Sequence, residues 1–118
     1  MFFRALVFAT GLSTTAAFAD APQITDAHAT RSGGGWRFDV TLLHPDTGWD
    51  HYADGWRVEL ADGTVLTTRV LAHPHVNEQP FTRSQTGVSV PEGVGTVYVR
   101  SRCIVDGWSE GVFALDLN

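Results

Sequence analysis

The chain of 118 residues contains no lysine, one methionine and one cysteine. The methionine is Met1, so the rest of the chain offers no thioether, the soft ligand that favours copper(I). The cysteine, Cys103, has no partner for a disulfide within the chain. It shares one face of an alternating apolar segment with valines, which predicts a buried, inert core thiol.

No hydrophobic run is long enough to span a membrane. Arg4 precedes an apolar run over residues 5–12, and small residues follow up to Ala17-Phe18-Ala19. This order is typical of a cleavable signal peptide, whereas a membrane-spanning helix needs roughly 20 apolar residues. We therefore predict a signal peptide over residues 1–19. Residues 20–118 would then form one exported, soluble periplasmic domain with no membrane insertion after cleavage.

Basic charge is also scarce, because 13 acidic residues face 8 basic ones and the net charge is −5. Loss of Arg4 with the signal peptide would make the net charge −6. The phosphates of nucleic acids and anionic lipid headgroups repel a domain of this charge, so we expect neither as a partner. The partners left open are a metal ion and a protein of unknown identity.

The sequence has no window with the periodicity of an amphipathic helix. Short segments of alternating apolar and polar residues recur instead, separated by glycine, proline, asparagine and aspartate, which is typical of β-structure. In the clearest of them, residues 36–44, the parity directs His44 inward at the end of the strand. We expect seven strands, over residues 23–30, 36–44, 55–60, 64–72, 81–90, 96–105 and 112–117.

Seven short strands in one domain predict an all-β, antiparallel, immunoglobulin-like or fibronectin-III-like sandwich. Trp56, which leads the third strand, is expected in its core. The central disulfide of antibody domains is missing, so the fibronectin comparison is the closer one. A small closed β-barrel is the alternative.

Antiparallel strands place alternate connections at the same end of a sandwich. Four of the five histidines fall in connections that would share one end, together with several carboxylates. Neutral imidazole and carboxylate are ligands of zinc and copper(II), so we predict a metal site there. Its candidate ligands are His44, His51, His73, His75, Glu78 and Asp50.

Other interpretations of these residues remain open. His73 and His75 flank Pro74; they share a face if that segment is extended, but not if it is a polyproline helix. His44 could be a rim histidine that bonds to a neighbouring carboxylate without a metal. The alternative function is a protein- or ligand-binding module that uses aromatic side chains at this end and no metal. Those side chains are Trp49, Tyr52 and Trp108.

An enzymatic function is not expected, because no serine or cysteine nucleophile lies in a recognisable motif.

Two longer motifs, Gly48 to Trp56 and His73 to Ser84, resemble a family of small, uncharacterised periplasmic proteins of Gram-negative bacteria. The resemblance spans most of the chain after the signal peptide and implies a shared fold and compartment, but no function. Relatives in that family carry a histidine at the position of Asp106 and a polar residue at that of Cys103. The second motif also suggests that Arg83 pairs with a loop carboxylate.

Overall fold

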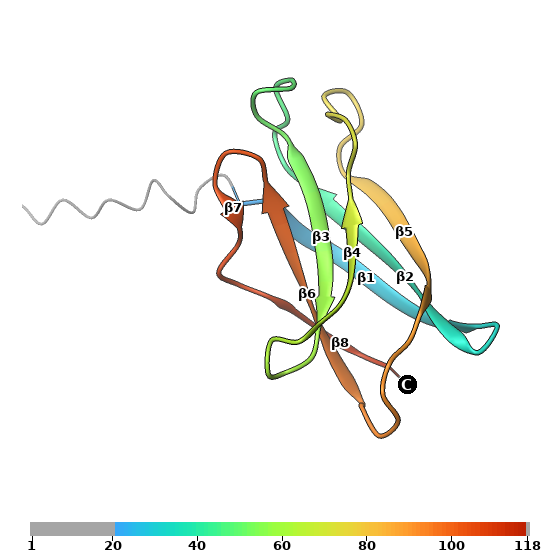
Figure 1. Ribbon diagram of the computed structural model, residues 1–118. Helices are drawn as coiled ribbons and strands as arrows, with labels where there is room; N and C mark the ends of the chain where they lie inside the picture. Colours follow the sequence, from blue (N-terminus) through green and yellow to red (C-terminus); the bar gives the residue numbers. More distant parts are fainter. Residues whose placement is uncertain (1–20, 118) are drawn as a thin grey trace, which may run out of the picture.

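A computed structural model describes residues 21–117, so the predicted signal peptide lies outside the described part. Within that part there is no helix of the length and hydropathy needed to cross a membrane. The described residues form eight strands (Figure 1): β1 (Gln23–Ser32), β2 (Gly35–Leu43), β3 (Ala53–Glu59), β4 (Val65–Val70), β5 (Phe81–Val88), β6 (Thr96–Cys103), β7 (Gly107–Trp108) and β8 (Phe113–Asp116).

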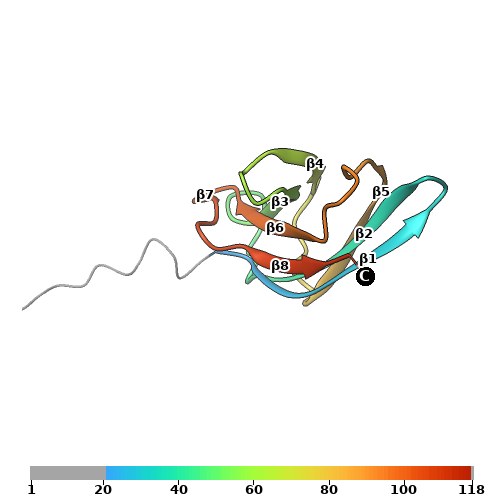
Figure 2. The same cartoon turned by 90° about the horizontal axis from the view of Figure 1, so that it is seen from below.

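The strands make two antiparallel sheets that pack face to face. One sheet has the order β1-β2-β5, and the other has the order β4-β3-β6-β7 with β8 also paired to β6. Figure 2 shows the two layers from below. The prediction of an all-β antiparallel sandwich is confirmed. The described strands form two separate sheets rather than one closed sheet, so the barrel alternative is wrong.

Each of the seven expected strands overlaps an observed one. The sixth ends at Cys103 rather than at residue 105, because the chain turns there to form the short strand β7, which the sequence did not predict. The expected hairpin at Asp62-Gly63 joins β3 to β4. Its turn uses a positive φ of 89° at Gly63, a conformation that glycine adopts without steric cost.

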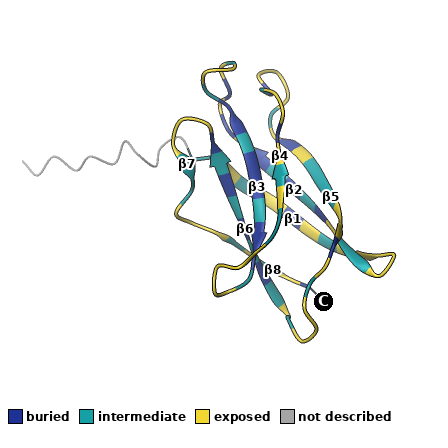
Figure 3. Cartoon of the chain, viewed as in Figure 1, coloured by how far each residue is buried: buried dark blue, intermediate teal, exposed yellow. Residues whose placement is uncertain are grey.

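The core lies between the sheets and follows the alternation of the strands. On β2 the side chains of Phe38, Val40 and Leu42 are fully buried, and on β3 those of Trp56 and Val58. Trp56 is therefore a core residue, as predicted. Figure 3 shows buried positions along the strands and exposed positions at the tips of the loops.

Three connections meet at one end of the sandwich, which we call the loop end: residues 44–52, 71–80 and 104–106. In Figure 1 the β2–β3 and β4–β5 connections lie side by side at the top, with the β6–β7 turn beside them. The sequence predicted this shared end from antiparallel connectivity alone. The histidines that it placed there define the region of interest.

Candidate metal centre

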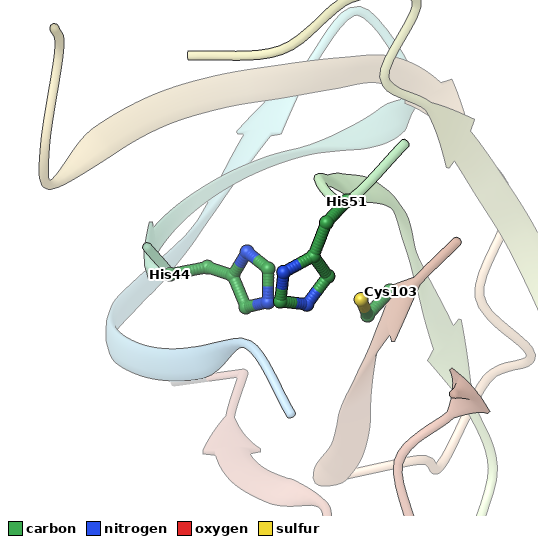
Figure 4. Close-up of side chains that lie close together, drawn as sticks. All are labelled: His44, His51 and Cys103. Carbon is green, nitrogen blue, oxygen red and sulfur yellow. The ribbon is translucent and has the colours of Figure 1, made fainter. Parts of the chain in front are cut away.

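Three side chains from separate segments converge at the loop end: His44, His51 and Cys103 (Figure 4). One nitrogen of each imidazole and the sulfur of Cys103 all lie within 4.8 Å of one another. Within residues 21–117 this is the one group of three candidate metal-ligating side chains that lie so close. We call these three residues the His₂Cys cluster.

His44 directly follows β2 and continues its inward parity. Its side chain is buried, with 1% of the residue exposed, as the alternation predicted. Its Nδ1 lies 2.6 Å from Oδ1 of Asp46. The Nε2 atom is also buried, yet it has no hydrogen-bond partner. A buried polar atom without a partner is uncommon in folded proteins and calls for a physical explanation.

Asp46 holds this end of the sandwich together. Its Oδ1 accepts the hydrogen bond of His44 and one from the backbone N–H of Ala53, at 3.0 Å, and its Oδ2 accepts one from the N–H of His75, at 2.8 Å. Because this carboxylate accepts hydrogen bonds from two backbone N–H groups, it also acts as the acceptor toward His44. The N–H at Nδ1 of His44 is therefore the donor to Oδ1 of Asp46. In the neutral ring, Nε2 then carries a free lone pair directed into the cluster.

A tight turn brings His51 beside His44. The N–H of His51 donates to the carbonyl of Gly48, at 3.1 Å, and the N–H of Thr47 donates to the carbonyl of His51, at 3.0 Å. The rings of His44 and His51 meet edge to face with centroids 4.8 Å apart. Nε2 of His51 is buried without a partner, although the residue as a whole is half-buried. The second imidazole thus repeats the feature of the first.

Strand pairing places Cys103 in the cluster. It is the last residue of β6 and lies opposite Ala53, the first residue of β3, in the antiparallel register. Because His51 precedes Ala53 by two residues, this register brings the thiol to the imidazoles. Cys103 is fully buried, as its parity predicted. Burial predicted an inert thiol, so Cys103 is not among the ligands predicted from the sequence.

The predicted ligands His73 and His75 lie outside the His₂Cys cluster. Their rings approach each other, with centroids 4.6 Å apart, but His73 is exposed and His75 is buried. The ring of His75 stacks on Phe81 at 3.9 Å. Burial lowers the pKa of His75 below its usual value, and the nearby positive charge of Arg83 lowers the pKa further.

The two predicted carboxylate ligands also lie elsewhere. Glu78 is exposed and pairs with Arg83 at 2.9 Å, which confirms that Arg83 pairs with a loop carboxylate. That hydrogen bond lowers the pKa of Glu78. Asp50 is exposed, on the turn that precedes His51. Neither belongs to the cluster of three.

The three aromatic residues of the alternative prediction have different environments. Trp49 is 65% exposed and meets Tyr52 edge to face at 5.8 Å, but Tyr52 itself is buried. Trp108 lies in β7 rather than in a loop, and its ring is covered by the guanidinium of Arg57 at 4.1 Å, with that of Arg102 at 6.0 Å. Trp49 is the one that remains largely exposed.

The geometry of the His₂Cys cluster suits a transition metal. Zinc binds imidazole nitrogen at about 2.0–2.1 Å and thiolate sulfur at about 2.3 Å, so ligand atoms around one ion lie about 3.5 Å apart. The three atoms within 4.8 Å would need to move by only about 1 Å each to share an ion. The Asp46–His44 pair has the form of the carboxylate–histidine contacts that orient metal-bound imidazoles.

Comparison with known proteins gives one informative relative. The chain is 40% identical over 94 residues to a protein of Halomicrobium mukohataei described as a "Putative lipoprotein". The match covers 79% of this chain but only 46% of that protein, so the chain spans about half of the relative's length. No protein-family model matches the chain. No solved structure matches it either.

Proposed function

We propose that this chain is an exported β-sandwich domain that binds one zinc or copper(II) ion through His44, His51 and Cys103. The observation that carries the proposal is the pair of buried Nε2 atoms without partners, on two imidazoles that lie close to a buried thiol. A bound ion would accept both lone pairs and would stabilise the thiolate form of Cys103. This ligand set retains two of the six residues proposed from the sequence and adds a sulfur.

The mixture of ligands supports both metals. Imidazole and thiolate together bind zinc, and two histidines with one cysteine also form copper electron-transfer sites. Asp46 would fix the tautomer of His44, so that the nitrogen facing the cluster is the one able to coordinate.

Two features support an exported domain. Residues 1–19 have the order of a signal peptide. The relative from Halomicrobium mukohataei is described as a lipoprotein, and lipoproteins are exported proteins. We propose a periplasmic location because the motifs Gly48 to Trp56 and His73 to Ser84 resemble a family of periplasmic proteins. The strand order, with one sheet β1-β2-β5, supports a sandwich of the immunoglobulin or fibronectin-III type.

Titration of the protein from residue 20 onward with zinc and with copper(II) tests the binding site. We expect one ion per chain and a rise in melting temperature on binding, because an ion that binds only the folded state stabilises it. His51→Ala and Cys103→Ala should each lower the affinity by at least tenfold. His73→Ala, an exposed histidine of the same end, is the matched control and should bind normally.

Two results would contradict the proposal. One is a wild-type protein that binds neither ion, by elemental analysis and by calorimetry. The other is binding that His73→Ala abolishes and Cys103→Ala leaves intact, which would return the site to the β4–β5 connection.

The exposed apolar side chains favour one second candidate, a protein-binding module. Six of the eight exposed large hydrophobic residues in the described part of the chain lie at or beside the loop end. Such clustering is typical of interaction surfaces. Under this alternative, chelators would change nothing, and Trp49→Ala would abolish capture of the partner. The six are Leu43, Trp49, Val70, Val76, Ile104 and Val105.

A further inference from the structure

We infer that a metal bound by the His₂Cys cluster would keep one coordination position open to a small anion or a water molecule from outside the chain. This inference rests on the proposed function and identifies the kind of ligand that the bound ion would take. It follows from the hydrogen bonds of the neighbouring polar side chains, which keep those side chains from serving as a fourth ligand. Zinc and copper(II) take at least four ligands in most protein sites, whereas the cluster supplies three.

Two polar side chains beside the cluster, Asp46 and Gln79, are engaged with the protein. Both oxygens of Asp46 accept hydrogen bonds. The amide of Gln79 is used at both ends, since Oε1 accepts from the N–H of His44 at 3.0 Å and Nε2 donates to the carbonyl of His75 at 2.8 Å. Neither group can turn toward a metal without leaving a buried donor or acceptor unpaired, at a cost of about 1–3 kcal/mol.

The remaining candidate ligands of the loop end lie outside the cluster. The two ring nitrogens of His75 are buried without partners, but its ring stacks on Phe81 and is not among the ligand atoms that lie within 4.8 Å of one another. Glu78 pairs with Arg83, and Nδ1 of His73 lies 3.1 Å from the carbonyl of Pro74. Residues 21–117 include no methionine, so a thioether cannot complete the coordination. Within this part of the chain, the exposed Asp50 is the remaining carboxylate that adjoins a ligand in sequence.

We expect access to the open position from the side of His51, by movement of its turn, because Nε2 of His51 is itself buried. His44 and Cys103 are buried, but His51 is half-buried and lies on a surface turn. A site with three protein ligands, one of them at the surface, has the form of zinc centres that exchange water for another ligand. The ligands that fit are small and anionic, because the ion would carry more positive charge than one thiolate neutralises.

Azide binding to the cobalt(II)-substituted protein tests the inference. Cobalt(II) replaces zinc in such sites and absorbs visible light, so ligand exchange changes its spectrum. We expect azide to change the spectrum in a saturable way, with one azide bound per cobalt. His73→Ala should respond as the wild type does, which excludes a separate cobalt site on that exposed histidine.

The outcomes separate this inference from the proposed function. If cobalt binds and its spectrum does not respond to azide, the protein fills every position and the inference is wrong, while the metal site stands. If Asp50→Ala then restores the response, Asp50 is the fourth ligand. If the wild-type protein binds neither zinc, copper(II) nor cobalt(II), the proposed function fails and the inference fails with it.

Discussion

Nδ1 of His44 and Oδ1 of Asp46 lie 2.6 Å apart in a fully buried pair. The same carboxylate receives backbone N–H groups from Ala53 and His75, so it joins the end of β2 to the start of β3 and to the β4–β5 connection. One side chain therefore positions a candidate ligand and also holds the surrounding loops. These two roles predict two separable effects.

Asp46→Asn should weaken both stability and metal binding. An amide presents only one acceptor oxygen, so a buried N–H loses its partner and unfolding should become easier by about 3 kcal/mol. Loss of the carboxylate behind a metal-bound imidazole lowers affinity by roughly 10–100-fold. Urea denaturation of the metal-free protein measures the first effect and calorimetry with zinc the second. Asp50→Asn, on the exposed turn, is the control. Unchanged zinc affinity in Asp46→Asn would leave Asp46 a purely structural role.

His75 should make the metal-free protein less stable in mild acid. Burial holds its pKa below the usual 6.5, so the folded state binds fewer protons than the unfolded state once the pH drops below that value. Stability should therefore fall from about pH 7 to about pH 5. His75→Phe keeps a ring to stack on Phe81 and cannot titrate, so its stability should vary less with pH.

The pH experiment has an internal control in His28→Gln. His28 is exposed and pairs with Asp26 at the surface. Urea denaturation of the three proteins at pH 7, 6 and 5 gives the comparison. The interpretation is wrong if His75→Phe loses as much stability as the wild type over this range.

Much of the fold was predictable because it depends on local alternation. The parity of residues 36–44 buries His44, and that of residues 96–105 buries Cys103, as the structure confirms. The hairpin at Asp62-Gly63 carried its own turn chemistry. The short strand β7 was not predictable, because two residues are too few to show an alternation of apolar and polar side chains.

The candidate site was only half predictable for a different reason. Loop topology showed which histidines share an end, but not which ring nitrogens meet. The pairing of Cys103 with Ala53 is a long-range register between β3 and β6, and a single sequence does not contain it. The available signal was the position of Cys103 at the end of a strand next to the loop end, where a buried thiol adjoins histidines.

Glu59 should contribute to stability far from the candidate site. It is buried and receives hydrogen bonds from Arg100 at 2.8 Å and from Arg57 at 2.6 Å. The bond from Arg100 is the larger cause that holds the pKa of Glu59 below 4.5, so its stabilising effect is present above that pH and is lost as pH falls further.

Glu59→Gln tests that contribution by urea denaturation at neutral and acid pH. At pH 7 it should lower the free energy of unfolding by about 1–2 kcal/mol, since the two arginines are partly exposed. Below about pH 4 the difference from wild type should shrink. Glu92→Gln, in an exposed turn, should change little. A difference that stays constant from pH 7 to pH 3 would argue against the ion pairs.

X-ray absorption at the zinc edge of the zinc-loaded protein tests the metal centre most directly. A centre built from His44, His51 and Cys103 predicts one sulfur at about 2.3 Å from the zinc and two imidazole nitrogens at about 2.0 Å. The sulfur signal should vanish in Cys103→Ser. A spectrum with nitrogen and oxygen neighbours alone in the wild-type protein would contradict the account, because Cys103 would then not bind the metal.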